Sequence, residues 1–295
     1  MDSRSKAVAL FVFAVVVWGS IGIFVRYIPL SSGFIAFARG VIGSCFLLCL
    51  LLATRRPFHF SPVRAELPMM IATGAAIGVN WALLFEAYRH TTVAVATLCY
   101  YFAPIMVIVA SPLVLRERLT PRKVACVLVA LVGVSLVSGV VGPGGSAAGG
   151  SVLGVAFGLS AAFFYGANML MNKLTPRTDP LEKTVIQLAA AAAVMVPYLL
   201  VTEDFGALQF TPLGTALLLG LGIVHTGIAY VAFFSSMRVL PAQTIAVLSY
   251  LDPATAIVLS ALLLAEPLTP MGLLGAVLIL GAAIASELGG EPAEQ

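Results

Sequence analysis

Three ionisable side chains lie inside long apolar runs of this sequence, where a charge is costly. Asp252 stands directly before Pro253, Arg39 lies in the run 32–53, and His225 lies in the run 212–236. A charged group at the centre of a membrane helix costs about 2.5–3.5 kcal/mol on insertion scales, so such residues indicate a cavity or a partner. Asp252 is a candidate for proton coupling or for binding an ammonium group. Its alternative role is a protonated carboxyl bonded to the backbone carbonyl that Pro253 leaves unpaired.

The other two ionisable groups, and one acid near the end of a run, also have open alternatives. Arg39 can hold a gate or a substrate carboxylate, or can pair with a helix end. His225 can bind substrate or exchange protons near neutral pH, whereas many single histidines only pack. Glu86 is placed with Asp252 and Arg39 as a coupling or gating residue, although it can also simply reach the membrane interface.

Amides and aromatic rings form a second group, suited to binding a zwitterion. Asn80 can bond both an amine and a carboxylate, and the adjacent Trp81 offers a ring face to apolar or cationic groups. Other aromatic residues stand in mid-run, whereas interface anchors stand at the ends of membrane helices. The predicted substrate-binding residues are Trp18, Asn80, Trp81, Tyr100, Tyr101, Tyr165, Asn168, His225, Tyr230 and Tyr250.

Neither a metal nor a cofactor is predicted. The four cysteines lie within apolar runs, with no Cys-x-x-Cys pair and no histidine at ligand spacing, so they are expected to pack. They are Cys45, Cys49, Cys99 and Cys126.

The composition predicts an all-α integral membrane protein. The 295 residues are 60% hydrophobic and 10% charged, and the mean hydropathy is +1.05. Soluble domains carry about 25% charged residues. About 20 apolar residues cross the hydrocarbon core as a helix. Ten runs of this kind are found, over 7–28, 32–53, 67–88, 92–115, 122–141, 152–173, 184–202, 212–236, 242–264 and 270–287.

The chain contains the same unit twice. Pro104 is followed thirteen residues later by Glu117-Arg-Leu-Thr-Pro, and Pro253 is followed thirteen residues later by Glu266-Pro-Leu-Thr-Pro. A repeat of this length in a hydrophobic chain is typical of transporters. The predicted domains are a five-helix repeat over 1–141, a Gly-rich periplasmic linker over 142–151, a second repeat over 152–287 and a cytoplasmic tail over 288–295.

The basic residues predict that the second repeat is inverted. With a cytoplasmic N-terminus, all of the 16 Lys and Arg residues except Arg26, Arg39 and Arg89 lie on the cytoplasmic side. Five spans per repeat then turn the second copy over. Pro104 and Pro253 are predicted hinges near the midplane. Glu117 and Glu266 are predicted to be structural and to accept N–H groups of the helices that begin at Pro121 and Pro270.

The motifs resemble the drug/metabolite transporter superfamily in its ten-helix EamA-type branch, over nearly the whole chain. The resemblance rests on Trp18-Gly19-Ser20, on Arg39 and on the two Pro…Glu-x-Leu-Thr-Pro units. It implies a basket of helices around a central cavity in the bacterial inner membrane, with the fifth and tenth helices peripheral. It also implies alternating-access export of small metabolites, as in YddG-like amino-acid exporters. The sequence alone leaves a monomer and a homodimer both open.

Amino acids, aromatic or other neutral ones included, are the leading substrate prediction. The alternative is export of drugs or other amphipathic metabolites. An intramembrane enzyme, which could use Ser249 with His225, lacks a Gly-x-Ser-x-Gly context. A channel would line its pore with a ring of polar residues. Few basic residues lie in the spans, which argues against phosphorylated substrates.

Overall fold

The computed structural model describes residues 3–55, 60–114, 120–137 and 151–288, which are built from helices. The helices of the first half are α1 (Ser3–Gly19), α2 (Ile21–Tyr27), α3 (Ser32–Ala53), α4 (Phe60–His90), α5 (Val93–Tyr100), α6 (Ala103–Val114) and α7 (Pro121–Val137). Those of the second half are α8 (Val152–Lys173), α9 (Pro180–Thr202), α10 (Pro212–Gly220), the π-helix η1 (Leu221–Ile228), α11 (Ala229–Met237), α12 (Ala242–Ser249), α13 (Leu251–Leu263) and α14 (Pro270–Leu288).

Each of the ten predicted runs coincides with one helix or with a broken series of helices. Within the described residues, seven helices are long and apolar enough to cross a membrane, while Leu251–Leu263 and Pro270–Ala285 are shorter apolar helices. The helix α7 has 17 residues. The protein is therefore an all-helical, multi-pass membrane protein. Ten spans and the inversion of the repeat remain predictions.

Two of the breaks lie one turn before the paired prolines. A proline has no N–H to donate to the carbonyl four residues earlier. The helix from Val93 accordingly stops at Tyr100, before Pro104, and the helix from Ala242 stops at Ser249, before Pro253. The structure places a break where each hinge was predicted; motion about these breaks remains a prediction.

A third break follows Gly19, where α1 passes close to α13. A Cβ added at Gly19 would lie 2.5 Å from the backbone oxygen of Asp252, so only glycine fits there. The hydroxyl of Ser20 donates to the carbonyl of Val17 at 2.7 Å. This crossing brings the end of α1 beside the acidic residue of α13.

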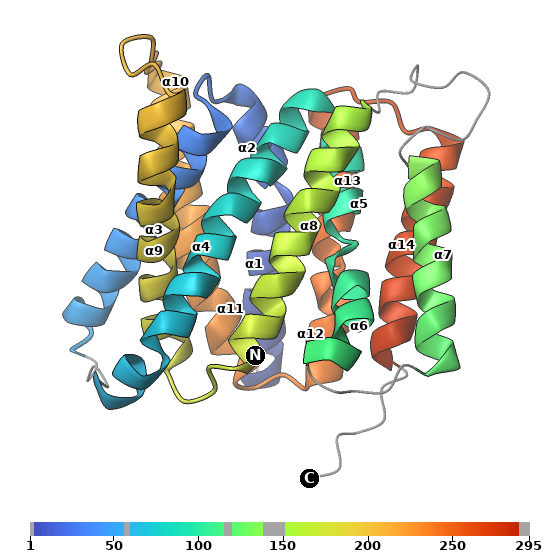
Figure 1. Ribbon diagram of the computed structural model, residues 1–295, viewed down its shortest axis with the longest axis horizontal. Coiled ribbons are helices and arrows are strands. Elements are labelled where there is room, and N and C mark those ends of the chain that lie inside the picture. The colour runs from blue at the N-terminus through green and yellow to red at the C-terminus, as the bar shows by residue number, and fades with distance from the viewer. Residues whose placement is uncertain (1–2, 56–59, 115–119, 138–150, 289–295) are drawn as a thin grey trace.

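The two halves of the chain interlock instead of forming separate lobes. Helix α4 packs against α8 and α9, α3 packs against α9, and α1 packs against α11 and α13. Figure 1 shows α4 beside α8, with α3, α9 and α10 towards one side. The pair α7 and α14 stands at the opposite edge, the peripheral place that the resemblance implied. The space that the two halves enclose therefore lies along α1, α4, α8 and α11.

The predicted linker 142–151 is described only at Ser151. The predicted tail 288–295 is described only at Leu288, the last residue of α14, and Glu117 also lies outside the described residues.

Candidate functional site

A cavity of about 710 Å3 lies between the two halves. Its volume is within the range of about 300–1,000 Å3 that is usual for sites of small-molecule ligands. The aromatic part of its lining comprises Trp18, Trp81, Tyr100, Tyr101, Tyr165 and Tyr230, together with Phe233 and Phe234. Pro104 lines it too, and the predicted polar residues that reach it are Arg39, Asn168 and Asp252.

The cavity lining is exposed at one end, called the open end below, and buried at the other, called the closed end. Its lining reaches Met237 at the end of α11, whose side chain is 41% exposed, and Pro180 at the start of α9. At the opposite end, Tyr88 and Thr97 also line it, but they are 5% and 3% exposed. Within the described part of the chain, the exposed residues of the lining therefore lie at the start of α9 and at the end of α11.

Arg39 of α3 presents the unused part of its guanidinium to the cavity. The side chain is buried, and its Nε donates to Thr226 Oγ1 at 2.8 Å. Its Cζ lies 4.0 Å from the centroid of the Trp81 ring, a cation–π contact. Among the described residues, neither terminal nitrogen donates a hydrogen bond within the protein. A planar fork of free N–H groups suits a carboxylate.

The π-helix η1 holds this arginine in place. Its wider turn lets Thr226 Oγ1 donate to the carbonyl of Leu221 at 2.9 Å, five residues earlier. The hydroxyl oxygen is thereby turned to accept from Arg39. Trp18 Nε1 donates to the carbonyl of His225, also in η1, at 2.8 Å. One irregular turn thus positions both a cation and an aromatic ring of the cavity, a common use of π-turns.

Asp252 supplies the opposite charge. It lies in the first turn of α13 and forms a hydrogen bond with Tyr101. Asp252 and Arg39 are near enough to interact electrostatically. A cavity with a carboxylate and a guanidinium can bind the ammonium and the carboxylate of one zwitterion.

Aromatic pairs form the walls between these charges. Tyr100 and Tyr165 stack with ring centroids 4.8 Å apart and planes 17° apart. Trp18 meets the edge of Tyr230 at 5.3 Å. Such surfaces hold apolar or cationic parts of a ligand at little cost in side-chain entropy. The predicted aromatic lining is thereby brought together around Arg39 and Asp252.

Four of the predicted binding and coupling residues lie outside the cavity lining. Asn80 Nδ2 donates to the carbonyl of Ala161 at 2.6 Å, so its amide joins α4 to α8 instead of meeting a ligand. Its Oδ1 accepts from the hydroxyl of Tyr100 at 3.5 Å. Tyr250 packs behind Tyr101. Asn80 and Tyr250 thus contact the tyrosines that line the cavity, and their predicted contact with substrate stays a prediction.

His225 and Glu86 are the other two predicted binding or coupling residues that lie outside the cavity lining. Both ring nitrogens of His225 have partners in the protein: Nε2 lies 2.9 Å from Ser20 Oγ, and Nδ1 lies 3.2 Å from the carbonyl of Gly220. Glu86 lies 3.0 Å from His90 Nε2 near the end of α4, where the side chains of Glu86 and His90 are 34% and 37% exposed. Neither side chain borders the cavity, because the first is used to bind α1 to η1 and the second faces outwards.

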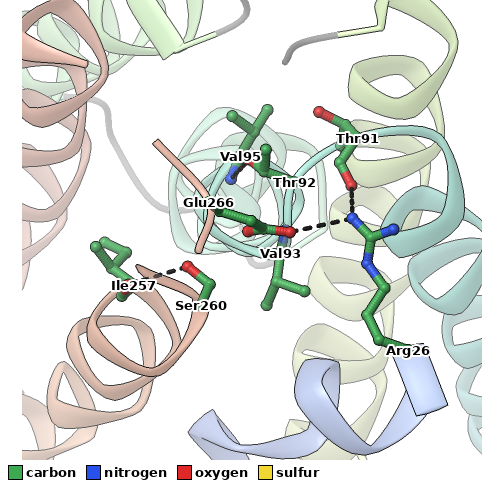
Figure 2. A network of polar contacts seen from close by, with 8 residues as sticks. All are labelled: Arg26, Thr91, Thr92, Val93, Val95, Ile257, Ser260 and Glu266. Atoms are coloured by element: carbon green, nitrogen blue, oxygen red, sulfur yellow. Dashed lines mark hydrogen bonds and ion pairs between the residues drawn. The ribbon is translucent and has the colours of Figure 1, made fainter. Parts of the chain in front are cut away.

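Glu266 is bound at a helix end, but not at the end that was predicted. Figure 2 shows its carboxylate between Val93 and Arg26. Oε2 accepts from the backbone nitrogen of Val93 at 2.8 Å, and Oε1 lies 3.1 Å from the guanidinium of Arg26. Arg26 also donates to the carbonyl of Thr91 at 2.8 Å. The acid thus caps α5 of the first half, whereas the prediction attached it to the helix that begins at Pro270.

The backbone explains this difference. Ala265 has φ 51°, in the left-handed region, and Glu266 N donates to the carbonyl of Ser260 at 3.2 Å. This is the usual termination of a helix by a left-handed residue. It ends α13 and turns the next side chain towards α5 before the chain reaches Pro270.

A polar track on α8 and α9 was missed, except for Asn168. Gln187 Nε2 donates to Asn172 Oδ1 at 2.9 Å, and Asn172 Nδ2 lies 3.0 Å from Asn168 Oδ1. These three amides line the cavity, as does Lys183. The prediction placed Lys183 in a loop, because it began the apolar run at 184. The signal that identifies the true start is Asp179-Pro180, an N-cap followed by proline at the first helical position.

Within the described part of the chain, no group of three or more His, Cys, Asp or Glu side chains could hold a metal ion. Of the cysteines, Cys45 and Cys49 are exposed, whereas Cys99 and Cys126 are buried, and all four are free thiols.

The chain matches the model of the EamA-like transporter family twice, over residues 5–139 and 152–286. A crystal structure of another protein is similar in fold, with a TM-score of 0.66 and 21% identity, covering 97% of this chain and 98% of the other.

Two relatives agree with the family match. The chain is 30% identical over 259 residues to the uncharacterized transporter YxxF of Bacillus subtilis, covering 87% of this chain and 81% of the relative. It is 31% identical over 195 residues to the pseudopaline exporter CntI of Pseudomonas aeruginosa, covering 66% of this chain and 65% of the relative. The chain therefore belongs to the EamA-like transporter family, and it is a transporter and not an enzyme.

Proposed function

We propose that this transporter exports amino acids, or metabolites that carry the amino-acid zwitterion, from the cytoplasm by alternating access. The observation that carries the proposal is the pair of opposite charges in one aromatic cavity. Arg39 offers free N–H groups for a carboxylate, and Asp252 offers a carboxylate for an ammonium group. The aromatic walls between them suit an apolar side chain.

The proposed architecture is ten spans in two inverted five-helix repeats in the inner membrane, with both termini cytoplasmic. The distribution of Lys and Arg supports this orientation. The open end of the cavity, with Pro180 and Met237, is then cytoplasmic, and the closed end, with Tyr88 and Thr97, is periplasmic. This conformation would load substrate from the cytoplasm.

The proposed mechanism moves the closure from one end of the cavity to the other. Opening the periplasmic end requires α5 to separate from the end of α13, which breaks the contact between Glu266 and Val93. The helix breaks before Pro104 and Pro253 lie where such a movement can bend the chain. Because the repeats interlock, one bend can open one end while it closes the other.

A second candidate function is export of drugs or other amphipathic metabolites. The cavity volume of about 710 Å3 favours it, since such a volume accommodates drug-sized ligands. The relative named as a pseudopaline exporter supports export of a metabolite in general.

Uptake into proteoliposomes separates these functions. The purified protein is reconstituted, and flux is measured for a panel of radiolabelled amino acids and for cationic dyes. The proposal predicts saturable flux of amino acids that dyes do not inhibit. Saturable dye flux without amino-acid flux would support the second candidate, and non-saturating flux would indicate a channel.

A further inference from the structure

We propose that the open end of the cavity holds a second anion-binding subsite, formed by Lys183 and Gln187, and that the preferred substrate is an elongated amino dicarboxylate. This inference rests on the proposed function and specifies its substrate class. One carboxylate lies at Arg39, the ammonium at Asp252, and the second carboxylate at Lys183.

The charges that line the cavity do not match a simple zwitterion. Among the described residues of the lining, the charged side chains are Arg39, Lys183 and Asp252. Two cations and one anion leave the lining with one more positive than negative group when a neutral amino acid is bound, and Glu66, which interacts electrostatically with Lys183, lies outside the lining. A charge in a membrane cavity is costly unless it is paired. A ligand with two carboxylates and one ammonium supplies the missing anion.

Lys183 and Gln187 have donors available for that carboxylate. Lys183 Nζ donates to the carbonyl of Thr175, which uses one of its three N–H groups. Gln187 Nε2 donates to Asn172 Oδ1, which uses one of its two. The two residues are four apart in α9, so they share one face of the helix. Both line the cavity.

Glu66 interacts electrostatically with Lys183 but does not line the cavity, so it leaves this subsite open. Its carboxylate already accepts hydrogen bonds from the backbone nitrogens of Arg177 and Thr178, at 3.1 Å each, and from Thr178 Oγ1 at 2.6 Å. Its role is to fix the loop that precedes α9.

The two cations start from backbone positions that are separated along α9, and each charged group has its own partner, Thr226 for Arg39 and the carbonyl of Thr175 for Lys183. Gly40, beside Arg39, contacts α9 at Leu188 and Ala192. These positions lie five and nine residues beyond Lys183, or about 8–13 Å along the helix. We therefore assign the two cations to two anionic groups at the two ends of one long ligand.

This separation favours amino dicarboxylates that are longer than glutamate. The carboxyl carbons of glutamate are four bonds apart, which spans about 5 Å in an extended chain with bonds of about 1.5 Å. In 2-aminosuberate they are seven bonds apart, or about 9 Å. The compound 2-aminooctanoate has the same length but ends in a methyl group, and it is the matched control.

The test is competition in proteoliposomes that contain the full chain. The label is whichever neutral amino acid the wild type transports, and the competitors are 2-aminosuberate and 2-aminooctanoate. The wild type is expected to bind 2-aminosuberate at least tenfold more tightly than 2-aminooctanoate, a difference of about 1.4 kcal/mol in binding free energy. Lys183→Met should bring the ratio of the two inhibition constants close to one, and Lys183→Arg should preserve it. The exposed Lys6 is outside the lining, so Lys6→Met should leave the ratio unchanged.

Equal inhibition by both compounds in the wild type would overturn the subsite and leave amino-acid transport intact. A preference that survives in Lys183→Met would also overturn it. If Lys183→Met transports nothing, the same ratio is measured in Gln187→Met, where an unchanged preference contradicts the proposal. Absence of flux for every amino acid in the wild type would instead refute the proposed function.

Discussion

The carboxylate of Glu266 accepts a hydrogen bond from the backbone nitrogen of Val93 at 2.8 Å, although 173 residues separate them in the chain. The acid follows α13 of the second half, and Val93 begins α5 of the first half. Arg26 completes the contact from the end of α2. This contact lies beyond the closed end of the cavity, so it stabilises the conformation in which Tyr88 and Thr97 are buried.

Removing this carboxylate should open the closed end. Glu266→Ala loses the bond to Val93 and the ion pair with Arg26, an expected cost of about 1–3 kcal/mol to the closed state. The rate at which a membrane-impermeant maleimide labels Thr97→Cys, in a chain without the four natural cysteines, should rise several-fold. Glu86→Ala is the matched control, because Glu86 pairs with His90 near the end of α4. Equal labelling rates in the two variants would contradict the role given to Glu266.

Ala265→Gly should stabilise the protein. Ala265 has φ 51°, and the left-handed conformation costs a residue with a Cβ about 1–2 kcal/mol. Glycine removes this cost, although it increases the entropy of the unfolded chain, so the net gain should be about 1 kcal/mol or less. Thermal unfolding in detergent should show a higher midpoint for Ala265→Gly and a lower one for Ala265→Val. A lower midpoint for the glycine variant would show that the turn is not strained.

Arg39→Lys should weaken substrate binding while the charge is kept. A lysine ammonium cannot present two parallel N–H groups to a carboxylate or stack as a plane on Trp81. The KM for amino-acid uptake should rise by about tenfold or more, which is about 1.4 kcal/mol. Arg122→Lys is the control, since Arg122 donates to the carbonyl of Ala285 away from the cavity. An unchanged KM in Arg39→Lys would place the substrate carboxylate elsewhere.

Thr226 should act through Arg39. Thr226→Val removes the oxygen that accepts from Arg39 Nε and leaves a buried N–H unpaired. The KM should rise as in Arg39→Lys, whereas Thr226→Ser keeps the hydroxyl and should restore most of the affinity. If the serine and valine variants have the same KM, the hydroxyl does not position the guanidinium.

The response of transport to pH should depend on Asp252 and not on His225. An ammonium group binds Asp252 only when the carboxyl is ionised, so KM should rise as the cytoplasmic pH falls. Asp252→Asn should show a KM that no longer varies with pH. The groups that act on Asp252 are Tyr101, by a hydrogen bond, and Arg39, by charge.

His225→Ala should keep the wild-type response, since both ring nitrogens of His225 are bonded within the protein, outside the cavity lining. If His225→Ala loses the response of KM to pH and Asp252→Asn retains it, then His225 and not Asp252 is responsible for the pH dependence.

Features that depend on local chemistry could be predicted from the sequence. The missing N–H of Pro104 and of Pro253 determines where two helices break. The mid-run position of Trp18 and Tyr101 separates lining residues from interface anchors. The two matches to the family model also agree with the repeat that Glu117 and Glu266 revealed.

Features that depend on the neighbour in space could not be predicted. An asparagine that binds a ligand and one that binds a backbone carbonyl have the same sequence signal. Only the position of α8 beside α4 brings the carbonyl of Ala161 within hydrogen-bond distance of Asn80. The π-turn at His225 packs against α3, which is distant in the sequence. To predict that Glu266 caps α5, one must know that two segments 173 residues apart in the chain meet in space. Lys183 was missed for a different reason, an error of a few residues in a helix boundary.

Counterflow in proteoliposomes tests the central claim most directly. Vesicles loaded with an unlabelled amino acid are diluted into a trace of the labelled one, for the wild type and for Arg39→Lys at equal protein content. Alternating access through the cavity predicts that label accumulates transiently and that this accumulation depends on the internal amino acid. The accumulation should saturate with substrate concentration, and the half-saturating concentration should be higher in Arg39→Lys. Label that equilibrates at the same rate with empty and loaded vesicles would contradict the account.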